Sequence, residues 1–270
     1  MTIKLGIIGG GVMGEAILSR LLTKEIYPAK KVLVSEPEKS RRDFLHQQYR
    51  VKVTEDNREA AAATDVLLLA IKPQVFDLVV AGLEVTPNKP LVISILAGVT
   101  LSRLIAAFPQ YPVIRAMPNT PATVGAAMTA LASHNQVQER HLAQAKSIFA
   151  AVGQVVEVPE SLMDAVTGLS GSGPAYVAIA IEALADGGVA AGLPRAVASR
   201  LALQTVLGTA QLIQEKGLHP AELKDRVTSP GGTTIAGVAQ LEKYGLRSAI
   251  IEAVLAAYRR SVELQSYLNE

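Results

Sequence analysis

Six residues near the start of the chain form a glycine-rich turn between a strand-like run and a helix-like segment. The turn, Gly9-Gly10-Gly11-Val12-Met13-Gly14, satisfies G-x-G-x-x-G in the context that this motif requires. Gly9 allows a tight turn, Gly11 lets the backbone approach a pyrophosphate, and Gly14 lets the helix pack closely on the strand. Free N–H groups at the start of the helix then face the phosphate charge. We therefore expect all six residues to contact a dinucleotide, either NADH or NADPH.

An acidic residue follows the second strand-like run, in Ser35-Glu36-Pro37. It lies roughly 20 residues beyond the glycine turn, where a carboxylate accepts hydrogen bonds from ribose hydroxyls, which favours NADH. Ser35 and Glu36 are both expected at the cofactor. Lys39, Arg41 and Arg42 follow at once, and they either neutralise the 2′-phosphate of NADPH or form a solvated helix face. The choice between the two cofactors stays open.

The glycine turn belongs to a longer alternation of short β-branched runs with helix-like segments, from residue 3 to about residue 158. This alternation predicts an α/β domain with a parallel, doubly wound sheet of the Rossmann type. From residue 161 Ala-rich helical periodicity takes over, so we expect a dinucleotide-binding domain at 1–159 and an all-helical domain at 160–270. The expected strands are Ile3–Ile8, Lys31–Ser35, Val66–Ile71, Leu91–Leu96 and Val113–Arg115. The expected helices are Val12–Lys24, Glu38–Tyr49, Asn57–Ala63, Gln74–Leu83 and Leu101–Phe108.

Two further strand ends are expected at the same crevice, because ligands of open α/β sheets bind beyond the carboxyl ends of the strands. The first is Ala70-Ile71-Lys72-Pro73, where Lys72 can reach the cofactor. The second is Ala97-Gly98, where small residues let a ring lie close. Each segment is also compatible with an ordinary turn, and their shared location is what favours a cofactor site.

The composition excludes several classes of protein. Lys and Arg (26) nearly balance Asp and Glu (24), and no stripe of positive charge appears, which argues against nucleic acid as a partner. The chain has no Cys, which excludes disulfides and thiolate catalysis, and its four His residues lack ligand spacing, so we expect no metal site. A hydrophobic content of 49% excludes a disordered chain.

The apolar stretch Tyr176–Ala191 is interrupted by Glu182 and Asp186, so we expect a buried helix and no membrane span. A helix that is apolar around most of its circumference must bury several faces. This favours a homodimer or a higher homo-oligomer formed through the helical domain. The first residues pass directly into the first strand, so we expect no signal peptide and a cytoplasmic protein.

Three segments follow one another in chain order: VIRAMPNTP at 113–121, GLSGSGPAY at 168–176 and LKDRVTSPGGTTI at 223–235. Together with the glycine turn and Ile71-Lys72-Pro73, they resemble Δ1-pyrroline-5-carboxylate reductases, the last enzymes of proline biosynthesis. The Ser-Pro-Gly-Gly-x-Thr stretch is the most specific part. The resemblance implies a Rossmann domain, a helical domain that interlocks with a second subunit, and reduction of the cyclic imine 1-pyrroline-5-carboxylate to L-proline with NADPH or NADH.

The resemblance also implies roles for single residues. The positions that match dinucleotide contacts are Asn57, Ile71, Lys72, Pro73, Ala97 and, near the C-terminus, Arg226. Glu160, Thr233 and Thr234 match positions near proline. Many family members have a small or amide residue where this chain has Glu36, which leaves the family's usual preference for NADPH open here.

The segment Ser229-Pro230-Gly231-Gly232-Thr233-Thr234 suits a substrate with a carboxylate, because it precedes a helical pattern whose first N–H groups are free. We expect Ser229, Gly231, Gly232 and Thr233 to hold the carboxylate. The hydroxyl of Thr234 would hydrogen-bond the ring nitrogen as the catalytic group. Spacing alone is also compatible with a linker and a Thr N-cap. Pro118 and Asn119 are expected to shape the nicotinamide pocket, or to form a rigid turn.

Two other functions fit parts of the sequence. β-Hydroxyacid dehydrogenases combine a similar glycine turn with a helical domain, and they resemble one another in G-x-x-G-x-G-x-x-x-K-x-x-N. This chain has Val177 and Ala180 where that pattern has Lys and Asn, so it lacks the acid/base group for alcohol oxidation. A catalytically silent dinucleotide sensor is the other alternative, and only turnover distinguishes it from an enzyme.

Overall fold

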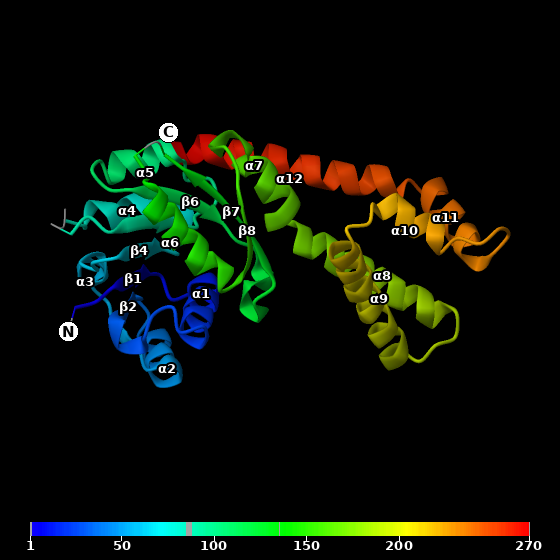
Figure 1. Cartoon of the computed structure of the whole chain (residues 1–270), viewed down its shortest axis with the longest axis horizontal. Helices are drawn as coiled ribbons and strands as arrows, with labels where there is room; N and C mark the ends of the chain where they lie inside the picture. The colour runs from blue at the N-terminus through cyan, green and yellow to red at the C-terminus, as the bar shows by residue number, and fades with distance from the viewer. Residues whose placement is uncertain (1, 85–87, 135, 270) are drawn as a thin grey trace. The chain divides into compact units, whose positions relative to one another are not determined.

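The computed structural model describes residues 2–84, 88–134 and 136–269, and Figure 1 shows its helices and strands. The chain divides into two compact units. The first contains residues 1–172 together with 255–270, and the second contains residues 173–254. The domain boundary expected near Pro159 from composition stays a prediction, whereas the contacts divide the chain thirteen residues later and return its end to the first unit.

The first unit is built on one sheet, which has eight strands in the described residues, in the order β3-β2-β1-β4-β5-β6-β7-β8. All neighbouring strands are parallel except β6 and β7, which are antiparallel. The order 3-2-1-4-5-6 is that of a dinucleotide-binding Rossmann fold, so the predicted fold class is confirmed. The strands are β1 (Leu5–Ile8), β2 (Val32–Ser35), β3 (Lys52–Thr54), β4 (Val66–Leu69), β5 (Leu91–Ser94), β6 (Val113–Met117), β7 (Ala127–Ser133) and β8 (Gly153–Glu157).

Helices cover both faces of this sheet, and the central strands are therefore buried on both sides. Successive residues alternate between two apolar clusters: Ile7 lies in one and Ile8 in the other, as do Leu68 and Leu69. Such continuous apolar runs are typical of parallel strands between helical layers. The α-helices are α1 (Val12–Thr23), α2 (Lys39–Tyr49), α3 (Asn57–Ala61), α4 (Phe76–Ala81), α5 (Leu101–Ala107), α6 (Glu139–Ala150) and α7 (Met163–Val166). Short 3₁₀ turns are η1 (Ala29–Lys31), η2 (Pro73–Val75), η3 (Thr120–Val124) and η4 (Glu160–Leu162).

All five predicted strands and all five predicted helices form, with shifts at their ends. The pattern did not predict β3, β7 or β8. β3 is a three-residue strand at the edge of the sheet, and β7 has the sequence AMTALAS, in which Thr129 is the one β-branched residue.

A π-helical turn, η5 (Thr167–Gly171), joins α7 to the next helix. Its i→i+5 bond runs from the N–H of Ser172 to the carbonyl of Thr167, over 2.9 Å. Pro174 has no N–H, so it cannot bond the carbonyl of Ser170 as a regular helix would. The π-turn ends at Gly171 and α8 begins at Gly173, and π-turns often lie at functional sites.

The second unit is helical throughout its described residues. Its helices are α8 (Gly173–Ala190), α9 (Arg195–Lys216), α10 (Pro220–Arg226), α11 (Thr233–Lys243) and the first part of α12 (Leu246–Asn269). Its small core consists of Ala185, Ala198 and Ala202. Large apolar side chains of α8 and α9 are exposed, among them Ile179 (64%) and Leu207 (56%). A single chain therefore leaves α8 partly uncovered, and its burial against a second copy stays a prediction.

In the part of the chain that the structure describes, no helix combines the length and apolar character that crossing a membrane requires.

Candidate active site

The glycine turn combines three crowded glycines, Gly9, Gly10 and Gly14, with one open glycine, Gly11. Gly9 has φ +104°, and a Cβ there would lie 2.5 Å from the carbonyl oxygen of Ala70. A Cβ on Gly14 would lie 2.2 Å from the carbonyl oxygen of Gly9. At Gly11, the N-cap of α1, a Cβ would meet nothing within 4 Å. Gly9 and Gly14 are therefore needed for the turn itself, whereas Gly11 leaves the open space at a helix start that a pyrophosphate requires.

The register of the sheet brings four strand ends to one level. Ile8, at the end of β1, pairs with Ser35 of β2 and with Leu69 of β4. Leu69 in turn pairs with Ser94 of β5. The segments that follow these strands leave the sheet along one edge, and they begin at Gly9, Glu36, Ala70 and Ile95. The sheet thus brings the predicted strand-end residues together as expected from the topology.

Side chains form hydrogen bonds with both backbone polar groups of Gly10. Its N–H donates to Oε2 of Glu36 over 2.9 Å, and its carbonyl accepts from Nε of Arg41 over 2.7 Å. The other oxygen of Glu36 accepts from the N–H of Glu38 over 3.2 Å. The Arg41 guanidinium is also paired with Glu15. Glu36 therefore lies against the glycine turn, the place expected for a residue that contacts ribose hydroxyls.

The three basic residues after Glu36 all have partners inside the protein. Arg42 is 15% exposed and donates to the carbonyls of Glu36 and Pro37 over 2.8 and 2.7 Å. Its guanidinium also pairs with Glu55. Lys39, 79% exposed, pairs with Asp43 one turn along α2, as a solvated helix face would. Arg42 thus stabilises the turn after β2 through its hydrogen bonds to the carbonyls of that turn.

Glu15 lies in a polar cluster beside the turn. Its burial raises its pKa, but hydrogen bonds from the Tyr49 hydroxyl and the Arg41 guanidinium, together with the charge of Arg41, outweigh this effect. The pKa of Glu15 is therefore below its ordinary value of 4.5. Burial, followed by the 2.6 Å hydrogen bond to Glu15, raises the pKa of Tyr49. The cluster fixes Arg41 beneath Gly10.

Two predicted cofactor residues from different elements are joined by a hydrogen bond. The hydroxyl of Ser35, at the end of β2, donates to Oδ1 of Asn57 over 2.7 Å. Ser35 is buried, and Asn57 is the first residue of α3. The amide nitrogen of Asn57 has no bonding partner in the described residues, so the pair leaves one donor at the edge of the sheet.

A cavity of about 490 Å³ in the first unit is lined by Pro73, Ala97 and Gly98, all predicted cofactor residues. Thr167 and Ser172 of the π-turn segment also line it, and its remaining wall is α12, with Ala257, Arg260, Ser261, Leu264 and Tyr267. The Ser261 hydroxyl donates to Asp164 of α7 over 2.7 Å and anchors that helix. The sequence did not predict that α12 lines this cavity, because a long amphipathic helix carries no local sign of what it packs against.

Asn119 connects three elements. Its Oδ1 accepts from the N–H of Met128, next to the start of β7, over 3.0 Å. Its Nδ2 donates to the carbonyl of Ser170 over 3.1 Å, the carbonyl that Pro174 leaves without a helical partner. Neighbouring Pro118 is buried at the end of β6. The predicted contact of Asn119 with a nicotinamide carboxamide stays a prediction, and its side chain already has a structural role.

The segment 229–234 begins α11. Gly231 has φ +68°, and Gly232 is the N-cap, with no side-chain cap of the helix. A Cβ on Gly232 would lie 2.3 Å from Oγ of Ser229, so this hydroxyl lies over the helix start. The first turn of α11 therefore presents N–H groups without a side-chain partner, which suits a carboxylate. Thr233 is exposed and Thr234 is partly exposed.

The remaining predicted residues lie apart along the chain. Arg226 ends α10, where it pairs with Glu222 over 2.7 Å. Lys72 is exposed at the start of η2. Glu160 lies in the first unit, whereas 229–234 and Arg226 lie in the second. The glycine turn at 9–14 and the segment 229–234 belong to different units, and a single cleft that both of them face stays a prediction.

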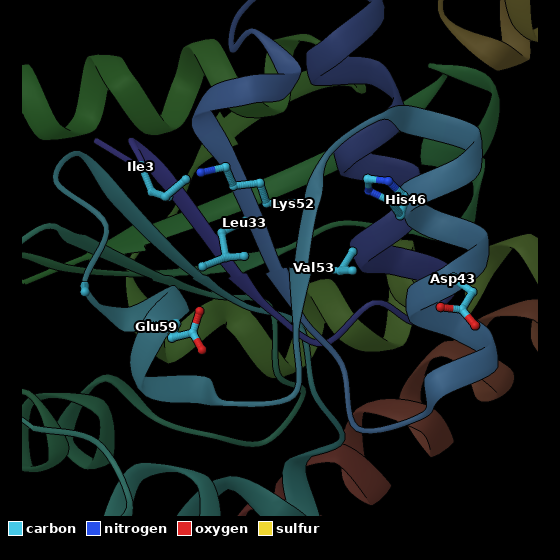
Figure 2. Close-up of a pocket in the computed structure, with 8 residues that line it drawn as sticks. Ile3, Leu33, Asp43, His46, Lys52, Val53 and Glu59 are labelled. Atoms are coloured by element: carbon cyan, nitrogen blue, oxygen red, sulfur yellow. The ribbon is translucent and has the colours of Figure 1, made fainter. Parts of the chain in front are cut away.

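Another hollow lies away from all of these residues. It measures about 700 Å³ and lies beside β3, at the edge of the sheet. Figure 2 shows seven of the residues that line it: Ile3 before β1, Leu33 of β2, Asp43 and His46 of α2, Lys52 and Val53 of β3, and Glu59 of α3.

Across the described residues, no group of three His, Cys, Asp or Glu side chains is arranged to hold a metal ion.

Comparison with known proteins accounts for both units. Residues 160–264 match a family model described as pyrroline-5-carboxylate reductase dimerisation. Residues 4–98 match one described as NADP oxidoreductase, coenzyme F420-dependent. The chain is 67% identical to a pyrroline-5-carboxylate reductase from Synechocystis over 98% of this chain and 99% of that protein. The chain belongs to the pyrroline-5-carboxylate reductase family.

Solved structures agree with this membership of the reductase family. A pyrroline-5-carboxylate reductase from Coxiella burnetii has a TM-score of 0.89 and 36% identity, covering 98% of this chain and 99% of that one. The Plasmodium falciparum pyrroline carboxylate reductase, solved with NADP bound, has a TM-score of 0.86 and 30% identity, covering 97% and 98%. An Arabidopsis thaliana pyrroline-5-carboxylate reductase is 44% identical over 97% of this chain and 95% of its own length.

Membership of the pyrroline-5-carboxylate reductase family confirms the resemblance predicted from the sequence. The first of its three segments covers β6 and the loop after it, the second the π-turn and the start of α8, and the third the end of α10 and the start of α11. Residues 160–264 carry the family's dimerisation region. The roles of single residues remain predictions.

Proposed function

We propose that the chain is an NAD(P)H-dependent pyrroline-5-carboxylate reductase, which converts 1-pyrroline-5-carboxylate to L-proline. The observation that carries this proposal is the 67% identity to the Synechocystis reductase over 98% of the chain. Such a relationship gives nearly the whole chain a counterpart in that reductase. The open space at Gly11 agrees with it, since a dinucleotide needs that approach.

The chemistry requires position more than an activated nucleophile. When bound, NADH or NADPH would supply a hydride to the C=N carbon of the protonated imine, and the electron pair of the C=N π bond would stay on nitrogen, which keeps its proton. The protein's contribution is to hold the two reactants in near-attack geometry, for which orientation offers roughly 7–11 kcal/mol.

The edge of the sheet supplies the cofactor residues in this proposal. Gly11 and the start of α1 hold the pyrophosphate, while Glu36 and the Ser35–Asn57 pair lie at the adenosine ribose. The segment from Ala70 to Pro73 and the residues Ala97 and Gly98 accept the nicotinamide half. The N–H groups around Gly232 and Thr233 hold the substrate carboxylate, and Thr234 bonds the ring nitrogen.

The functional protein is a homo-oligomer formed through the helical region. Every long helix of the second unit exposes large apolar side chains, and the small alanine core leaves them uncovered. A second copy with the same surface covers them. Light scattering at micromolar concentration should give at least twice the chain mass, and Leu207→Asp on α9 should lower it. A clean monomer would contradict this assembly.

The activity is tested by mixing purified protein with 1-pyrroline-5-carboxylate and either NADH or NADPH. Oxidation of the cofactor should follow by absorbance, and chromatography should show L-proline in equal amount. Binding of either cofactor without turnover would instead identify a sensor. Oxidation of a β-hydroxyacid in the reverse direction, with no reaction of the imine, would favour the dehydrogenase alternative.

A further inference from the structure

Arg115 is an unusual residue for the centre of a sheet. It lies in β6 between apolar neighbours, is 2% exposed, and is the largest fully buried side chain in the described residues. Its strand neighbours in register are Ser94 of β5 and Ala132 of β7. A buried guanidinium must be compensated, because removing its charge from water is costly. In the described residues it forms one ion pair, with Glu160.

Glu160 is bound through a single oxygen. Its Oε1 accepts from Nη1 of Arg115 over 3.2 Å and from the N–H of Leu101 over 2.5 Å. Leu101 is the first residue of α5, so the carboxylate also meets the positive end of a helix. Oε2 receives no hydrogen bond from the described residues, and the side chain is 32% exposed. One oxygen is thus fixed while the other remains available.

Stability alone accounts poorly for this arrangement. Replacing a buried ion pair with well-packed apolar residues is often neutral or stabilising. An aliphatic residue at 115 would match Val113, Ile114 and Ala116 of the same strand. Arg115 instead connects β6 to the segment in which the helical region begins. The Arg115 guanidinium acts on one group, the Glu160 carboxylate, and it sets the orientation of that carboxylate.

We propose that Arg115 is a positioning residue for the reaction: it fixes Glu160 so that the negative charge of Oε2 faces the protonated ring of the substrate. This inference rests on the proposed function, together with the position near proline that the family resemblance implies for Glu160. The fixed negative charge stabilises the positive charge of the protonated ring, whose hydrogen bond is assigned to Thr234, and it repels the substrate's own carboxylate. Arg115 thereby selects the orientation in which nitrogen, and not the carboxylate, approaches Glu160.

A double-mutant cycle tests whether Arg115 acts through Glu160. Arg115→Met and Glu160→Gln should each lower kcat/KM for the imine by about tenfold, the effect of one charge-assisted hydrogen bond. The KM for the cofactor should not change. The double variant should lose no more than either single variant, because both remove the same contact. Arg115→Lys should recover part of the activity, since it keeps a cation at the site.

Lys146→Met is the matched control. It also removes an ion pair, that between Lys146 of α6 and Glu157 of β8, and kcat/KM should not change. Urea unfolding shows whether each variant is folded, and Arg115→Lys replaces Arg115→Met in the cycle if the latter fails to fold. Losses that multiply in the double variant, or a fully active Glu160→Gln, would overturn the proposal while leaving the proposed function intact. An inactive wild-type protein would instead overturn the function itself.

Discussion

The carboxylate of Glu36 accepts a hydrogen bond from the N–H of Gly10 over 2.9 Å. This bond joins the end of the second strand to the glycine turn, although the two residues lie far apart in the sequence. It places a negative charge where the 2′ position of an adenosine ribose is expected. The charge favours the 2′-hydroxyl of NADH and opposes the 2′-phosphate of NADPH.

Replacing Glu36 with serine should therefore shift cofactor preference toward NADPH. The ratio of kcat/KM for NADPH to that for NADH should rise by roughly tenfold or more, because a like-charge repulsion at close range is removed. Glu38→Ser removes the same charge two residues away, from an exposed side chain, and serves as control. An equal shift in both variants would mean that Glu36 does not face the ribose.

The glycine turn offers a second test, because its glycines differ in the space around them. Gly11→Ala should unfold in urea like the wild type but bind NADH and NADPH more weakly, since a methyl group fills the open approach. Gly14→Ala should lose about 1–3 kcal/mol of unfolding free energy or more, because its Cβ would overlap the carbonyl of Gly9. Titration by cofactor fluorescence separates the two effects. Unchanged binding by Gly11→Ala would place the pyrophosphate elsewhere.

The sequence predicted those parts of the site whose signals are local. The glycine turn, the strand ends and the helix start at 233 each depend on a few adjacent residues. Once the strands alternate with helices, topology places their carboxyl ends along one edge. The position of Glu36 beside Gly10 follows from that register.

Other parts required contacts between distant residues. Nothing in VIRAMPNTP shows that Arg115 is buried against Glu160, since the run resembles an ordinary core strand. Asn119 bonds to Met128 and Ser170, and the second bond exists only because Pro174 leaves a carbonyl unbonded. Neither can be read from spacing, because each depends on how β6, β7 and the π-turn pack.

Acid should weaken the cluster around Glu15. Its pKa is lower in the folded protein than its ordinary value of 4.5, so the carboxylate stabilises the fold above that pH. This contribution is lost as the pH falls through the folded value. Urea unfolding of Glu15→Gln should therefore show a deficit at neutral pH that shrinks progressively below pH 4.5. A deficit that stays constant in acid would show that the charge of Glu15 does not matter.

Removing the amide of Asn119 should destabilise the protein more than it alters a cofactor contact. Asn119→Ala leaves the N–H of Met128 and the carbonyl of Ser170 without partners, at a cost of about 1–3 kcal/mol for each group that stays buried. Urea unfolding measures this loss. Asn88→Ala, at an exposed position, should stay within about 0.5 kcal/mol of the wild type. Full stability combined with a raised cofactor KM would instead assign Asn119 to the nicotinamide pocket.

Thr234 is the residue most directly tied to the proposed reaction. Thr234→Ala should lower kcat/KM for the imine by about 1.5–3 kcal/mol, the effect of losing one hydrogen bond to a charged group. The KM for the cofactor should stay the same, because the residue is assigned to the substrate. Steady-state kinetics with varied imine at saturating cofactor measures the change.

Two variants separate the hydroxyl of Thr234 from its role in starting α11. Thr234→Ser keeps the hydroxyl and should retain most of the activity. Thr228→Ala removes a nearby hydroxyl that donates to the carbonyl of Lys224 over 2.7 Å, and it should leave kcat/KM unchanged. If Thr234→Ala is as active as wild type, the ring nitrogen has another partner. The helix start would then serve only to hold the carboxylate.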